Sequence, residues 1–306
     1  MVLLLLTGCI FELFNQRTTY LATEYTIEHP RIVALSLNPP RIEPGQAYET
    51  DALLAAPPDI EVQQWTLKTC ALGRDVPTYI NNLNCFNDPT EITVLATATE
   101  LPLAWTPPEI PEISCDWGKY GADTAWEYDT GNYGKDTGSG VDPPCNHDLP
   151  LVLEATVDDQ PVLAAAFVRW FSNASPRPQP VSMREARVEL RLPDTARAGD
   201  AVDVEILVEN DRRDASFFWY VDAGTLEKTG WTSAQSWVAD DPSWAEGRTG
   251  STNRWHLPDD ASGALRLMVT VVPCPPGENC SPSRRNSDTE YGLNMTWAQH
   301  ALEVTP

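Results

Sequence analysis

The chain has 306 residues, and its 44 acidic residues outnumber the 21 Lys and Arg to give a formal net charge of −23. Such a surplus of carboxylates repels phosphate groups, so the composition excludes nucleic acid as a partner. The length suits two domains, and 17 glycines and 27 prolines among β-branched and aromatic residues predict an all-β fold.

The chain opens with an apolar run that ends in small residues, Met1-Val2-Leu3-Leu4-Leu5-Leu6-Thr7-Gly8-Cys9. This run is too short to span a bilayer and is typical of the end of a secretory signal. Its last four residues resemble the lipobox of bacterial lipoproteins, in which the Cys receives a diacylglyceryl group. The resemblance implies a signal peptide remnant over residues 1–8 and a palmitate-bearing lipid anchor on Cys9. The alternative is an ordinary hydrophobic N-terminus with an odd thiol, because no Lys or Arg precedes the run.

Ile10 follows the lipobox cysteine, where enteric lipoproteins retained in the inner membrane have Asp. The resemblance therefore implies a protein anchored in the bacterial outer membrane, facing the periplasm or the cell surface. Residues 9–30 show no clear hydrophobic period and are predicted to be a flexible tether between the anchor and a folded body.

Two stretches of the sequence share one pattern at an offset of 154 residues. An alternating strand over residues 33–37 leads to Gly45, and another over 188–192 leads to Gly199. A second alternating strand follows each glycine, and Trp65 and Trp219 each lie twenty residues after it. The offset predicts two domains of the same type.

The order of strand, glycine turn, strand and tryptophan resembles the A, B and C strands of an immunoglobulin-like sandwich. The resemblance implies that Trp65 and Trp219 fill equivalent core positions. Residues 151–157 and 265–272 would be central F strands, and 162–170 and 295–304 closing G strands. Similar immunoglobulin-like or PKD-like modules occur in bacterial surface proteins, in particular lipoproteins of myxobacteria. The predicted domains are residues 31–172 and 185–306, joined by a proline-rich linker over 173–184.

Six further cysteines fall into three neighbouring couples, which leaves Cys9 as the odd one. Six cysteines allow about 15 pairings, but neighbours in a β protein often close the loop between them. We therefore favour three pairs, Cys70 with Cys85, Cys115 with Cys145, and Cys274 with Cys280. Disulfides imply an oxidising compartment.

The loop over residues 115–145 is the segment with the most unusual composition, because aromatic and acidic residues alternate with glycines. Indole faces stack on sugar rings while carboxylates accept their hydroxyl hydrogen bonds, and the same oxygens bind Ca²⁺. The candidate ligand-binding residues are Trp117, Asp123, Trp126, Asp129 and Asp136. The alternative is a disulfide-closed loop whose aromatics pack on the sandwich.

The second domain has its own tryptophan-rich segment, with Trp231, Trp237, Trp244 and Trp255. We expect Trp255 to lie in the core, and the sequence leaves Trp237 and Trp244 undecided between core and contact surface.

No motif for catalysis stands out. The four histidines have no metal-ligand spacing, and the chain contains no Gly-x-Ser-x-Gly elbow, phosphate-binding loop or dinucleotide fingerprint. We therefore expect no enzyme, no metal site and no cofactor, with Ca²⁺ as the one ion to consider. The sequence favours a structural or binding module of the cell envelope, with an envelope protein or a polysaccharide as its partner. The alternatives are a carbohydrate- or calcium-binding adhesin that uses residues 115–145 and, more remotely, a glycan hydrolase.

Overall fold

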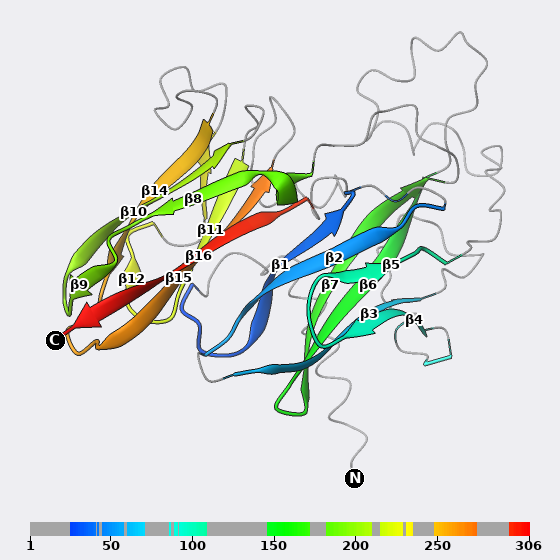
Figure 1. Ribbon diagram of the computed structural model, residues 1–306, viewed down its shortest axis with the longest axis horizontal. Coiled ribbons are helices and arrows are strands. Elements are labelled where there is room, and N and C mark those ends of the chain that lie inside the picture. The colour runs from blue at the N-terminus through cyan, green and yellow to red at the C-terminus, as the bar shows by residue number, and fades with distance from the viewer. Residues whose placement is uncertain are drawn as a thin grey trace, which may run out of the picture.

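The computed structural model shows a protein built almost entirely of β-strands, as the sequence predicts (Figure 1). The residues that it describes are 25–40, 42, 45–57, 60–70, 86, 89–90, 92–108, 146–171, 182–209, 215–228, 231–234, 248–273 and 294–306. In these parts of the chain, no helix combines the length and the apolar character needed to cross a membrane.

The first sandwich consists of two antiparallel sheets that enclose one core. Its inner sheet has the order β1-β2-β5, from β1 (Arg31–Asn38), β2 (Tyr48–Ala55) and β5 (Leu103–Trp105). Its outer sheet has the order β4-β3-β6-β7, from β4 (Ile92–Ala98), β3 (Val62–Cys70), β6 (Asn146–Val157) and β7 (Gln160–Phe171). These are the sheet partners of an immunoglobulin-like sandwich, with β1 to β7 in the order A, B, C, C′, E, F, G.

The second sandwich repeats this plan with two additional short strands. Its inner sheet has the order β13-β11-β15-β16-β9, from β13 (Trp231–Ala234), β11 (Ala215–Val221), β15 (Gly263–Pro273), β16 (Thr296–Thr305) and β9 (Thr195–Arg197). Its outer sheet has the order β12-β14-β10-β8, from β12 (Thr225–Leu226), β14 (Arg248–His256), β10 (Ala201–Glu209) and β8 (Arg187–Arg191). The predicted F and G strands of both copies are confirmed.

The two sandwiches have the internal equivalence that the sequence repeat predicts. Trp65 lies on β3 and Trp219 on β11, each the C strand of its sandwich, and both indoles are buried in the core. Gly45 and Gly199, which precede the B strands, both have a positive φ, at 71° and 78°. A left-handed backbone favours glycine, which explains why the repeat keeps this residue at both turns.

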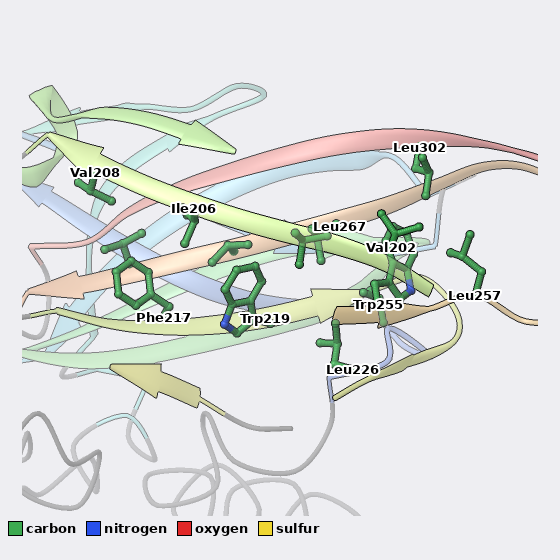
Figure 2. Packing of buried hydrophobic residues seen from close by; sticks show 14 of the residues in the cluster. Val202, Ile206, Val208, Phe217, Trp219, Leu226, Trp255, Leu257, Leu267 and Leu302 are labelled. Atoms are coloured by element: carbon green, nitrogen blue, oxygen red, sulfur yellow. The ribbon is translucent and has the colours of Figure 1, made fainter. Parts of the chain in front are cut away.

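Figure 2 shows the core of the second sandwich, where aliphatic side chains from both sheets surround Trp219 and Trp255. The Trp255 side chain is fully buried, and its indole N–H donates a 2.9 Å hydrogen bond to the carbonyl of Ala223. The prediction that Trp255 belongs to the core is therefore confirmed. The side chain of Trp231 and the segment holding Trp237 and Trp244 lie outside the described residues.

A third core joins the inner sheets of the two sandwiches, so that four sheets are stacked (Figure 1). Its buried residues are Ile27, Val33, Ala34, Leu53, Ala55, Phe218, Tyr220, Met268 and Val272. All six inner residues of β1 are buried, and so are all seven residues of β11. The predicted alternation over residues 33–37 therefore does not separate a core face from a solvent face, because both faces of β1 are covered.

Polar contacts reinforce both ends of this junction. Near the end of β2, the Arg266 guanidinium donates two hydrogen bonds to the Asp222 carboxylate, each 2.9 Å, and a third to the carbonyl of Ala56 in the first sandwich. At the start of β2, Arg184 pairs with Glu49 at 2.7 Å. The junction is thus fixed by hydrophobic burial along its length and by an arginine at each end.

Residues 25–27, which we expected to be part of a flexible tether, instead pair with the second sandwich, where Thr26 forms an isolated parallel β-bridge with Val221. The Ile27 N–H donates to the Val221 carbonyl at 2.9 Å, and the Val221 N–H donates to the Tyr25 carbonyl at 2.8 Å. The predicted tether boundary at residue 30 is therefore wrong, because Ile27 is buried in the third core. The predicted linker also ends early, since Met183 is buried in the second sandwich and its N–H donates to Asn294.

Tyr220 brings a hydroxyl group into the third core. Burial raises the pKa of Tyr220 to about 12 from an ordinary value of 10.0, while Arg31 and the Thr270 hydroxyl lower it by less. The Arg31 guanidinium lies 5.5 Å from the centre of the ring. Among the described residues, the hydroxyls of Tyr220, Thr270 and Ser36 have no partner with ordinary hydrogen-bond geometry.

We expect Tyr220→Phe to remove part of the loss of stability at high pH. The raised folded-state pKa makes neutral Tyr220 stabilising at pH values below 10, and this contribution is lost as the pH rises to about 12. The difference between an ordinary pKa of 10.0 and one of about 12 corresponds to about 3 kcal/mol of unfolding free energy. Urea unfolding of both proteins at pH 7 and across the alkaline range measures this difference. Parallel pH profiles for the two proteins would contradict it.

Candidate functional site

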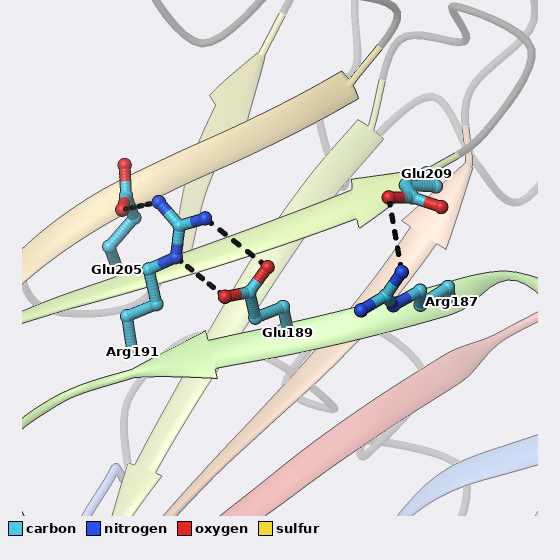
Figure 3. A network of polar contacts seen from close by, with 5 residues as sticks. All are labelled: Arg187, Glu189, Arg191, Glu205 and Glu209. Carbon is cyan, nitrogen blue, oxygen red and sulfur yellow. Dashed lines mark hydrogen bonds and ion pairs between the residues drawn. The ribbon is translucent and has the colours of Figure 1, made fainter.

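The outer face of the β8, β10 and β14 sheet carries a dense set of charged side chains (Figure 3). Strand geometry places them there, because alternate residues point to opposite faces. On β10, Val202, Val204, Ile206 and Val208 point into the core, so Asp203, Glu205 and Glu209 point outward. Arg187, Glu189 and Arg191 on β8 and Arg254 on β14 complete the charged face.

Opposite charges on this face are paired with one another. Arg191 lies between two carboxylates, with Nε 2.8 Å from Glu189 and Nη1 3.1 Å from Glu205. Arg254 Nε is 2.7 Å from Asp203, and Arg187 Nη1 is 3.9 Å from Glu209. The face is consequently polar but close to neutral, in a chain whose net charge is strongly negative.

The pairing shifts the ionisation of several groups. The hydrogen bond from Arg254, with its positive charge, holds the pKa of Asp203 below the ordinary range. Hydrogen bonds to Glu189 and Glu205 raise the pKa of Arg191, although partial desolvation opposes this, and the bond to Asp203 raises that of Arg254. All three groups stay charged near neutral pH, and such exposed pairs contribute little to folding stability.

Beside these pairs lies an open hollow of about 760 Å³. It is lined by Arg191, Leu192, Asp203, Val204, Glu205, Glu227, Lys228, Thr252, Asn253 and Arg254. Its Asn253 amide makes three hydrogen bonds: the oxygen accepts from the backbone N–H groups of Lys228 and Arg254, and the nitrogen donates to the Lys228 carbonyl. The lining holds no aromatic side chain on which a sugar ring could stack.

Asp203, in the lining of the hollow, is unsuited to act as the general acid of glycoside hydrolysis. A general acid must keep its proton near neutral pH, which requires a raised pKa. Asp203 is instead 77% exposed, and its pKa is lowered by Arg254. Elsewhere in the described part of the chain, no three His, Cys, Asp or Glu side chains are grouped so that they could hold a metal ion. The lining of the hollow consists mainly of polar and charged side chains.

Most site residues predicted from the sequence lie outside the described part of the chain. These are Cys9, Cys85, Cys115, Trp117, Asp123, Trp126, Asp129, Asp136, Cys145, Cys274 and Cys280. Cys70 is described: it ends β3, is buried, and is disulfide-bonded. Its pairing with Cys85 and the other two pairings stay predictions.

The strands of the first sandwich show where the predicted loops leave the body. A short connection joins the last residue of β2 to the first residue of β3, at one end of the first sandwich. The first residue of β2 and the last residue of β3 therefore both lie at the other end of this sandwich. Trp105, the last residue of β5, pairs with Tyr48 at the start of β2. The segments that hold Cys85 and residues 115–145 therefore both leave from this end, which we call the loop end.

The second sandwich likewise has its longer connections at one end. Its strands β10, β13 and β15 end at Glu209, Ala234 and Pro273, beside the first residues of β14 and β11. Arg184, close to the start of β8, forms an ion pair with Glu49 at the start of β2. The loop ends of the two sandwiches therefore lie on the same side of the molecule. Residues 25–27 pair with Val221 at the far end of β11, on the opposite side.

Comparison with known proteins gives no family assignment. No protein-family model matches the sequence, and no curated protein matches it. Among solved structures, a similarity to native E. coli alpha-2-macroglobulin has a TM-score of 0.25 and 13% identity. It covers 90% of this chain and 17% of that chain. A similarity this weak carries no argument about fold or function.

We expect Arg254→Gln to raise the pKa of Asp203 toward its ordinary value, because the variant removes the positive charge that holds it down. A carbon NMR titration of the Asp203 carboxyl group measures the change. Arg187→Gln is the matched control, since Arg187 pairs with Glu209 and should leave Asp203 unchanged. An unaltered Asp203 titration in Arg254→Gln would mean that the pair does not persist in solution.

Proposed function

We propose that the protein is a non-catalytic lipoprotein of the bacterial cell envelope, in which two joined sandwiches hold a binding platform away from the membrane. The junction core supports the structural part of this proposal. Flexibly linked domains would expose the apolar residues of β1 and β11, whereas the stacked arrangement buries both faces of these strands. The two sandwiches would therefore behave as one rigid body.

The opposite positions of residues 25–27 and of the loop end support the part of the proposal that concerns binding. The strap formed by residues 25–27 lies opposite the loop end. With a lipid on Cys9, the 15 residues from Ile10 to Glu24 span at most about 50 Å when extended. The loop end is then the part of the body suited to meeting an envelope protein or a polysaccharide.

The chemistry of the cysteines agrees with an extracytoplasmic location. Cys70 is disulfide-bonded, and stable disulfides form in oxidising compartments such as the periplasm. Three couples among six cysteines leave Cys9 as the thiol available for lipidation, and Ile10 favours the outer membrane.

We expect cells that express the chain behind a bacterial lipoprotein signal peptide to incorporate labelled palmitate into it, and Cys9→Ser to abolish that label. Detergent phase partitioning should move the protein from the detergent phase to the aqueous phase in the same variant, because the anchor is lost. Cys280→Ser is the matched control, since it removes a cysteine without touching the lipobox. Label retained by Cys9→Ser would overturn the anchor.

A second candidate function is that of an adhesin for carbohydrate or Ca²⁺ through residues 115–145. The observation in its favour is that the flanking strands β5 and β6 meet at the loop end, opposite the strap. In this position aromatic and acidic side chains would be presented to material outside the membrane.

We expect the double variant Trp117→Ala and Trp126→Ala to lose polysaccharide binding in a pull-down if the adhesin function is right, because stacking on indole is lost. Replacement of both by Tyr is the control, since the phenol ring keeps a stacking face. Titration calorimetry with Ca²⁺ on Asp129→Asn and Asp136→Asn tests the ion separately. Unchanged pull-down by the alanine variant would reject the sugar-binding function.

A further inference from the structure

The strap at residues 25–27 and the strand β1 follow one another in the chain but are held very differently. Strand β1 pairs with β2 over seven residue positions, and its six inner residues are buried. The strap instead forms a single isolated β-bridge, from Thr26 to Val221. Glu28 and His29, in the segment between the strap and β1, are exposed. The strap is therefore attached to the body separately from β1.

Few contacts attach the strap. In the described part of the chain it makes two backbone hydrogen bonds, both with Val221, at 2.9 Å and 2.8 Å. The Thr26 carbonyl accepts a longer hydrogen bond, of 3.4 Å, from Arg31 Nη2. Ile27 is buried in the third core, and Tyr25 is partly buried against the second sandwich. Burial of Ile27 is thus the main apolar contribution that keeps the strap in place.

Detachment of the strap leaves the rest of the body intact. The other eight buried residues of the third core lie on β1, β2, β11 and β15, which are held by their own strand pairing. Proteins open locally where buried contacts are few, at a lower free energy than global unfolding requires. The strap meets this description, so it can detach and reattach while both sandwiches stay folded.

Detachment also changes the length of chain between the N-terminus and the body. With the strap attached, the chain meets the body at Tyr25, whereas with the strap detached it meets the body at Arg31, the first residue of β1. The six residues 25–30 are then added to the tether, and they extend its reach by at most about 20 Å. A pull on the N-terminal side favours the longer state, because the work done by a force grows with the extension.

We propose that the strap is a releasable latch that sets the reach of the N-terminal tether. At rest, the burial of Ile27 and the hydrogen bonds with Val221 keep the tether short. Under tension between the membrane anchor and a partner bound at the loop end, the strap detaches and the body moves away from the membrane without unfolding. This inference rests on the proposed lipid anchor at Cys9, because only an anchored chain carries such a load. The latch itself is a property of the chain without lipid.

Native-state hydrogen exchange tests the latch on the full chain purified without lipid. The amides of Ile27 and Val221 are protected by the strap, whereas the Tyr220 amide faces β15, since alternate residues of a strand donate to opposite neighbours. We expect Ile27 and Val221 to share one protection factor, at least about tenfold lower than that of Tyr220. Equal protection of the three amides would mean that the strap opens only when the sandwich unfolds, which overturns the proposal.

Two variants separate opening of the strap from global unfolding. We expect Ile27→Ala to lower the protection factor of Val221 about tenfold or more, because the buried side chain of the strap is truncated. Val272→Ala is the matched control, since Val272 lies in the same core but at the other end of β11, beside Ser216. It should lower the protection of Tyr220 and leave that of Val221 unchanged. A parallel fall of both amides in Val272→Ala, or an unchanged Val221 in Ile27→Ala, contradicts the latch.

Force spectroscopy on the same chain, held at the Cys9 thiol and at the C-terminus, tests the change in length. We expect a reversible extension of at most about 20 Å before either sandwich unfolds. In Ile27→Ala this step should move to lower force or vanish. A wild-type trace whose first event is the unfolding of a sandwich would overturn the proposal. Absence of palmitate labelling in cells would instead reject the anchor, and it would leave the exchange and force results as they are.

Discussion

The structure depends on the burial of both faces of its two middle sheets. Neither sandwich is self-contained, because the β1-β2-β5 sheet has one face in the first core and the other against the second sandwich. Phe218 and Met268 would be solvent-exposed apolar side chains if the second sandwich stood alone. Full burial of such a side chain contributes about 1.5–3 kcal/mol, so separating the sandwiches would cost several of these contributions. The fold is best understood as four layers with three cores.

Electrostatic contacts are placed where this hydrophobic junction ends. Arg266 satisfies Asp222, which is 11% exposed, and also reaches the Ala56 carbonyl of the first sandwich. Such a partly buried pair contributes more than the exposed pairs on β8 and β10, because solvent screens it less. The strap at residues 25–27 closes the same end by pairing with β11. Together these contacts fix the relative orientation of the two sandwiches, which non-directional hydrophobic burial alone would not specify.

The sequence predicts the all-β class and the strand order well, and the residues show why. Trp65 and Trp219 fill the centre of a sandwich, and Gly45 and Gly199 need a left-handed backbone, so local chemistry dictates both. The sequence did not predict the junction, although the apolar run over residues 217–221 in β11 is the signal of a strand buried on both faces. It did not predict the charged face of β8, β10 and β14 either, since pairs such as Arg254 and Asp203 lie 51 residues apart in the chain. The strap has only Ile27 as a local signal, and its position depends on the tertiary partner Val221.

The two outer sheets differ in how many charged residues their exposed positions carry. The outer face of the second sandwich has charges of both signs in neighbouring positions, which keeps it solvated and leaves little net field to attract ions. On β4 of the first sandwich, by contrast, there is no charge, and Val94 is exposed. The β4 strand contacts the short β5 of the other sheet, as β1 contacts β7. Contacts between the lateral strands of the two sheets, rather than charge, therefore protect the edges of the first sandwich.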